Sequence, residues 1–217
     1  MIDPLEGASL GDVTVIVVAC QYTQPPKHQP EPIDLAAVFL RLADSAWSRI
    51  GEFESLIRPP QHAAITAPEA LRTGINPLRL VSKPAAAQVL GRLDGLLDAP
   101  PYVLVSYNAR TLARVLYQYR EHCPRLAQTY MINTHELARK LLPELPAHHL
   151  EAVLRHLELP ARAEPHRAAP DLEAGIRVFE YLAELADSAW GSGALRHLRR
   201  MAGITPQATV PVQESMF

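Results

Sequence analysis

The sequence predicts an α/β domain in which helices flank a mixed β-sheet, and three observations lead to this prediction. An apolar, β-branched run at 13–21 (VTVIVVACQ) lies between Gly11-Asp12 and a proline-rich stretch, as expected of a buried central strand. Two more strand-like runs follow without a helix between them, which indicates an antiparallel meander. From residue 85 onward, helical spacing of apolar residues alternates with short strand-like runs.

The elements are expected in the following order. The proline-rich stretch 24–32 is a connection, because proline disrupts both helices and central strands. A helix after residue 133 is expected to begin with a capping box of Asn133 and Glu136. The predicted strands are 13–21, 33–42, 52–57, 102–107 and 130–132, and the predicted helices are 85–97, 112–123, 134–142, 147–159, 171–189 and 194–201.

Composition limits the classes of function. With 217 residues the chain can form one domain with a sizeable core, and a net charge of -2 requires any nucleic-acid binding to use a local patch. The two cysteines are too few and too far apart for a disulfide framework or a zinc site. No leader pattern or membrane-length apolar run occurs, so we expect a cytoplasmic protein without a membrane partner.

The predicted organisation is a main domain at 1–190, a short helix at 191–202 and a flexible tail at 203–217. Arg196, Arg199 and Arg200 share one face of the short helix, opposite its apolar residues. We interpret this face as a solvated one, and weak contact with phosphates is the alternative.

Several short segments resemble known landmarks in their order and spacing. They are 53–59 (FESLIRP), 72–75 (RTGI), 83–84 (KP), 105–109 (VSYNA), 133–139 (NTHELAR), 149–150 (HL) and 166–171 (HRAAPD). Together they resemble the DnaQ-like (DEDD) 3′–5′ exonuclease superfamily over residues 12–187, and are similar to its proofreading members of the bacterial DNA polymerase III epsilon type. The resemblance implies a ribonuclease H-like fold.

The resemblance also locates the residues that the family uses for catalysis. Its members hold two divalent metals with four carboxylates and use a histidine as general base. The first motif falls on Ala19 and Gln21, the second on Leu112, and the third is intact as His166 and Asp171. Mg²⁺ requires anionic oxygen ligands to replace its water, so we expect no bound metal, no cofactor and no catalytic residue.

Four polar residues remain to be interpreted. Asp34 and Glu136 are of the right type to replace a lost ligand, but we interpret them as exposed surface acids. His166 and Asp171 are interpreted as structural remnants: a loop histidine, and an acid that favours the start of a helix.

The last five residues, QESMF, resemble the Gln-x-x-Leu/Met-Phe peptides that bind the bacterial sliding clamp. The resemblance implies that the Gln213 amide forms hydrogen bonds while Met216 and Phe217 fill an apolar pocket. A chance match of five terminal residues is the alternative.

We therefore expect a catalytically inactive binding module in DNA replication or repair, with the sliding clamp, single-stranded DNA and other replication or repair proteins as candidate partners. Tyr107 and Asn108 are the candidate residues of a nucleic-acid groove. Tyr107 fits a stacking role and simple packing on the core equally well. The alternatives are an active 3′–5′ exonuclease with an altered metal site and a purely structural subunit.

Overall fold

A computed structural model of the chain describes residues 5–98, 100–161 and 165–206. Six strands form one mixed sheet in the order β3-β2-β1-β4-β5-β6. The sheet contains β1 (Thr14–Thr23), β2 (Glu31–Ala43), β3 (Ala46–Leu56), β4 (Tyr102–Ser106), β5 (Met131–Asn133) and β6 (Gly203–Ile204). The first three strands form the predicted antiparallel meander, and β4 and β5 run parallel to β1.

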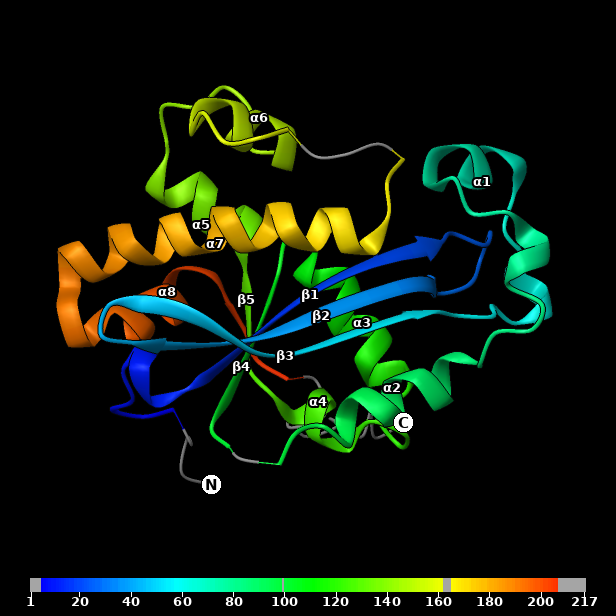
Figure 1. Ribbon diagram of the computed structural model, residues 1–217, viewed down its shortest axis with the longest axis horizontal. Coiled ribbons are helices and arrows are strands. Elements are labelled where there is room, and N and C mark those ends of the chain that lie inside the picture. The colour runs from blue at the N-terminus through cyan, green and yellow to red at the C-terminus, as the bar shows by residue number, and fades with distance from the viewer. Residues whose placement is uncertain (1–4, 99, 162–164, 207–217) are drawn as a thin grey trace, which may run out of the picture.

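Helices cover both faces of this sheet (Figure 1). They are α1 (Ala67–Thr73), α2 (Ala86–Asp94), α3 (Ala109–Gln118), α4 (Pro124–Gln128), α5 (Thr134–Leu141), α6 (Leu150–His156), α7 (Ala168–Trp190) and α8 (Ala194–Ala202). Helix α7 packs across β1 and β2, with α5, α6 and α8 on its side, while α2, α3 and α4 cover the opposite face. The α/β, ribonuclease H-like fold class predicted from the sequence is confirmed.

The alternation of side chains along β1 divides the core into two clusters. Val15 and Val17 face the α7 side, whereas Ile16 and Val18 face the α2–α4 side. This alternation places Ala19 on the α7 side with Val17. Both faces of β1 are covered, which explains why the strand reads as a continuous apolar run.

The structure corrects the predicted start of the tail and the predicted capping box, and the helix predicted at 112–123 is α3, which ends at Gln118. The tail does not begin at Gly203, because Gly203 and Ile204 pair with β5 and extend the sheet by one strand. Glu136 does not complete a capping box in the structure. The Asn133 side chain accepts a hydrogen bond from the His135 N–H, and Glu136 forms an ion pair with Arg139 at 3.3 Å.

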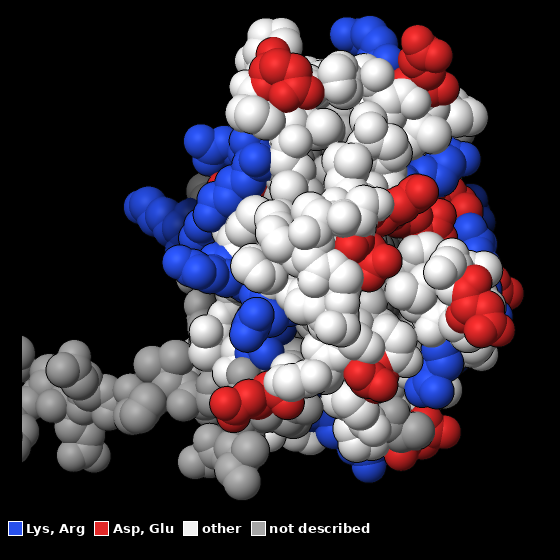
Figure 2. Space-filling model, turned by 90° about the vertical axis from the view of Figure 1, so that its left-hand side faces the viewer, with Lys and Arg blue, Asp and Glu red and all other residues white. Residues whose placement is uncertain are grey.

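Charged side chains are unevenly distributed over the molecule. Figure 2 shows the side of the molecule that lies on the left in Figure 1. On this side, basic groups gather along one edge and acidic groups lie mainly elsewhere. No helix in the described parts of the chain is long and apolar enough to cross a membrane.

Candidate active-site cavity

A cavity of about 520 Å³ lies beside the C-terminal end of β1. Its walls come from segments far apart in the sequence: the end of β1, helix α1, the β4–α3 connection, the start of α6 and the start of α7. The polar lining residues include Gln21, Gln24, Glu69, Arg72, Ser106, Asn108, Thr134, Glu151, His166 and Asp171. The fold therefore brings Ala19, Gln21, Tyr107, Asn108, His166 and Asp171, all singled out in the sequence, to one cavity.

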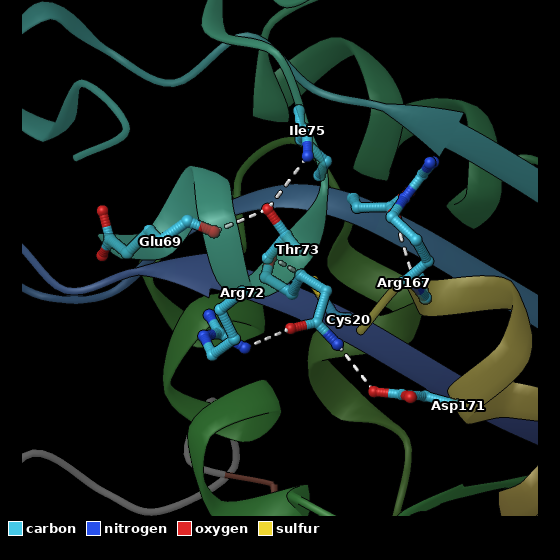
Figure 3. Close-up of polar contacts among 10 residues, drawn as sticks. Cys20, Glu69, Arg72, Thr73, Ile75, Arg167 and Asp171 are labelled. Carbon is cyan, nitrogen blue, oxygen red and sulfur yellow. Dashed lines mark hydrogen bonds and ion pairs between the residues drawn. The ribbon is translucent and has the colours of Figure 1, made fainter. Parts of the chain in front are cut away.

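Gln21 lies at the centre of a three-residue network in this cavity. Its Nε2 donates a hydrogen bond to Asp171 Oδ2 at 2.7 Å, and its Oε1 accepts one from Arg72 Nη1 at 2.8 Å. Arg72 and Asp171 approach the end of β1 from α1 and α7, respectively (Figure 3). The amide thus joins a guanidinium to a carboxylate, and Gln21 is only 6% exposed.

An amide suits this position in a way that a glutamate would not. Gln21 can donate to a carboxylate and accept from a guanidinium at the same time. Two carboxylates at the Gln21–Asp171 distance would repel each other unless a cation or a proton lay between them. In this structure, the N–H donor replaces the need for such a cation beside Asp171.

The ligand set does not fit the two-metal site that the resemblance implies. Ala19 has no oxygen in its side chain, and the guanidinium of Arg72 bonds the only side-chain oxygen of Gln21. Leu112 is 1% exposed and packs into the apolar cluster between the sheet and α2–α4. Within the described residues, no three His, Cys, Asp or Glu side chains form a group able to hold a metal ion. We therefore derive no catalytic step that uses metals.

Asp34 is not a surface acid, so that interpretation is wrong. It is fully buried and stands opposite Gln21 across the β1–β2 pair. Its Oδ2 accepts hydrogen bonds from Arg167 Nε at 2.6 Å and from the Ala168 N–H at 2.9 Å. A buried carboxylate requires such partners, and here it caps the start of α7, the helix that carries Asp171.

A glycine turn fixes the position of His166. Gly74 follows α1 with a φ of 62°, and a Cβ there would lie 2.5 Å from Cγ of Pro165. The close approach lets the His166 N–H donate to the Arg72 carbonyl at 3.1 Å. The Thr-Gly-Ile segment thus ties α1 to the loop before α7, so Arg72 and His166 reach the cavity together.

Tyr107 and Asn108 line the cavity near α6. The Tyr107 hydroxyl donates to the His148 carbonyl at 2.6 Å, and its ring meets the His135 ring edge-on at 5.9 Å between centroids. Burial raises the pKa of Tyr107 and the charge of Glu151 adds to this shift, so the hydroxyl remains a donor. Asn108 is exposed at the start of α3. Whether either residue binds nucleic acid remains a prediction.

The lining of the cavity is acidic. Glu69, Glu151 and Asp171 contribute carboxylates, and Arg72 contributes a guanidinium. Burial alone would raise the pKa of Glu69, but hydrogen bonds from Thr66 and Gln24 and the charge of Arg72 outweigh burial and lower it. Glu151 lies 3.1 Å from His149. Such a lining repels phosphates, so a nucleic-acid ligand would have to contact this cavity mainly through its bases.

Comparisons with known proteins agree with this architecture. The RNase_T exonuclease family pattern matches residues 19–179, so the chain belongs to this exonuclease family. No curated protein matches the chain.

Solved structures show the same fold. The nuclease domain of 3'hExo, a DEDDh family member bound to rAMP, is 18% identical with a TM-score of 0.65, over 79% of this chain and 92% of that one. Exonuclease X, in complex with 5' overhanging duplex DNA, is 18% identical with a TM-score of 0.59, over 85% and 98%. E. coli Exonuclease I, in complex with a dT13 oligonucleotide, is 18% identical with a TM-score of 0.64, over 82% of this chain and 42% of that one.

Two residues that form or support this cavity, Arg72 and Asp34, were not predicted as site residues. Arg72 begins the RTGI segment at 72–75, and nothing in a single sequence indicates that its side chain turns toward Gln21. Asp34 did carry a signal: it interrupts an apolar strand run, and an acid inside such a run must be paired if it is buried. Gln213, Met216 and Phe217 lie outside the described residues.

Proposed function

We propose that this protein is an exonuclease-fold binding module that lacks two-metal catalysis and acts in DNA replication or repair. The observation that carries the proposal is the Gln21 amide, which bridges Arg72 and Asp171 where the family places a carboxylate. The neutral Gln21 amide carries no negative charge for a metal ion, and its N–H gives the Asp171 carboxylate a partner that is not a metal.

The proposed partner at the tail is the bacterial sliding clamp. Gln213, Met216 and Phe217 match the Gln-x-x-Leu/Met-Phe pattern. A short peptide of this kind binds through one polar anchor and two apolar side chains that fill a pocket. The tail follows a domain of an exonuclease family, which supports a function on nucleic acid.

The proposed ligand of the cavity is a single-stranded 3′ end. Structures similar to this chain contain rAMP or a dT13 oligonucleotide. Tyr107 offers a ring and Asn108 an exposed amide at the wall of the cavity. Aromatic stacking on a base does not require a metal.

A nuclease assay tests the absence of catalysis. The purified protein is incubated with labelled single-stranded DNA and Mg²⁺ or Mn²⁺, and we expect no shortening of the strand. Turnover that disappears in Asp171→Ala would contradict the proposal. It would favour an active 3′–5′ exonuclease with an altered metal site, for which the retained His166 and Asp171 are the supporting observation.

A pull-down tests the tail. Removal of residues 213–217 should abolish association with the clamp and leave the melting temperature unchanged. The matched control is the double substitution Glu214→Ala/Ser215→Ala, which alters the two unspecified positions of the motif and should retain binding. If the truncated chain still binds the clamp, the tail assignment is wrong. If neither clamp nor DNA binds the full chain, the protein is a structural subunit.

A further inference from the structure

The sequence around α8 is unusually free of acids. No aspartate or glutamate occurs between Asp187 and Glu214, while three arginines lie in the middle of this segment. Helix α8 buries Leu195 and Leu198 against the domain, and its arginines at i, i+3 and i+4 share the other face. We call Arg196, Arg199, Arg200 and the neighbouring Tyr130 the α8 arginine surface.

These side chains surround a hollow of about 400 Å³. Its lining consists of Tyr130, Arg196, Arg199, Arg200, Gly203 and Thr205. The Arg199 guanidinium lies over the Tyr130 ring, with its Cζ 4.4 Å from the ring centroid. Stacking restricts this long side chain, so less conformational freedom is lost when it binds a ligand.

Helix stability does not account for all three arginines. Arg199 and Arg200 are in the last turn of α8, where cations interact favourably with the helix dipole. Arg196 is the third residue of the helix, close to the positive end of the same dipole, where a cation is unfavourable. The helix dipole therefore does not explain Arg196.

Neighbouring groups add to the positive charge. Lys140 on α5 donates to the Met201 carbonyl at 2.6 Å, next to the end of α8. Arg139 on the same helix does not add to this charge, because it forms an ion pair with Glu136. Among the described residues, the lining of this hollow holds three arginines and no acid, in contrast to the acidic lining of the cavity.

The geometry points to the α8 arginine surface as a second nucleic-acid contact, which binds the phosphate backbone of a strand away from the cavity. Guanidinium groups bind phosphates through two parallel hydrogen bonds, and three on one face match a polyanion with repeated charges. The surface lies at the opposite end of α7 from Asp171 (Figure 1). The inference rests on the proposed function only in taking nucleic acid as the partner.

The test measures the affinity of the full chain for fluorescent single-stranded and duplex oligonucleotides over a range of salt concentrations. The triple variant Arg196→Gln/Arg199→Gln/Arg200→Gln should bind at least about tenfold more weakly at low salt. Loss of three phosphate contacts should reduce the slope of log K against log salt by roughly 2 for a single strand. The lysine variant of the same three positions keeps the charge and should retain most of the binding.

A matched control keeps the change in net charge the same. Arg79→Gln/Arg92→Gln/Arg120→Gln removes three exposed arginines that line neither the cavity nor the α8 hollow, and it should bind like the parent chain. Unchanged melting temperatures would show that all the variants fold.

Each other outcome overturns the inference. If the triple glutamine variant binds oligonucleotides like the parent, the contact lies elsewhere and the proposed function still stands. If the variant binds oligonucleotides normally but loses the clamp, the surface is a protein interface. If the parent binds no oligonucleotide, both the inference and the proposed cavity ligand fail, whereas the clamp pull-down still tests the tail separately.

Discussion

The cavity beside β1 and the α8 arginine surface show two different uses of charged side chains. In the cavity, Gln21 links Arg72 to Asp171 over short hydrogen bonds, and buried Asp34 holds the start of α7 nearby. On α8, the arginines line a hollow on a segment without acids. The cavity polar groups are therefore held by one another, whereas the α8 arginines lie together on the surface that we propose as a phosphate contact. Substitutions in the two regions should differ accordingly.

The largest expected effect is at Asp34. Asp34→Ala removes the partner of Arg167 and the acceptor of the Ala168 N–H, and should destabilise the protein by about 3 kcal/mol. This is the low end of the range for broken buried pairs, because the Arg167 side chain is 26% exposed. Chemical denaturation measures the loss.

The exposed pair Arg49–Glu173 provides a control of the same chemistry. Its side chains are 49% and 44% exposed, so Glu173→Ala should cost less than about 1 kcal/mol. Equal losses of unfolding free energy in Asp34→Ala and Glu173→Ala would contradict the view that burial makes the Asp34 contacts more important than an exposed ion pair.

Restoration of the first acidic motif should have the next largest effect. In Ala19→Asp/Gln21→Glu, a carboxylate replaces the amide that donates to Asp171, and the resulting repulsion should cost roughly 2 kcal/mol in EDTA. Mn²⁺ should then raise the melting temperature, because a cation can bind between the acids. Thermal denaturation with and without Mn²⁺ measures both effects.

Gln21→Met is the control for this reversal. It removes both hydrogen bonds without adding charge, so Mn²⁺ should not change its melting temperature. If the double variant is as stable in EDTA as the parent, the hydrogen bond from the Gln21 amide does not stabilise the Asp171 carboxylate.

A smaller, pH-dependent effect is expected at Glu69. Hydrogen bonds from Thr66 and Gln24 outweigh burial and lower its pKa in the folded state. The ionised form therefore stabilises the fold above the pKa of the unfolded chain, and this contribution is lost as pH falls through the lower, folded-state pKa. Glu69→Gln should cost roughly 0.5–1 kcal/mol at neutral pH, as for other helix caps. Stability curves that stay parallel down to acidic pH would argue against this account.

The smallest effect is expected on α8. Arg200→Gln should alter the free energy of unfolding by no more than about 0.5 kcal/mol, because the residue is exposed. The same variant should weaken oligonucleotide binding measurably at low salt. A large loss of stability would show that Arg200 stabilises the fold, as the cavity residues do. The contrast between the two regions would then be wrong.

The sequence alone determined the fold class, the order of the main strands and helices, and the family, but not the short elements α1, α4 and β6. The features that it determined follow from period-two and helical spacing of apolar residues and from short motifs, which are local properties of the chain. It also determined that Ala19, Gln21 and Leu112 cannot act as carboxylate ligands, since this depends only on residue type.

Only the tertiary structure decided what the residues at these positions contact. Arg72 and Gln21, and Gln21 and Asp171, meet across long sequence separations, and Asp34 reaches the start of α7 in the same way. The addition of β6 to the sheet likewise depends on where β5 leaves an open edge. Such pairings depend on the packing of whole elements, so no local pattern in a single sequence records them.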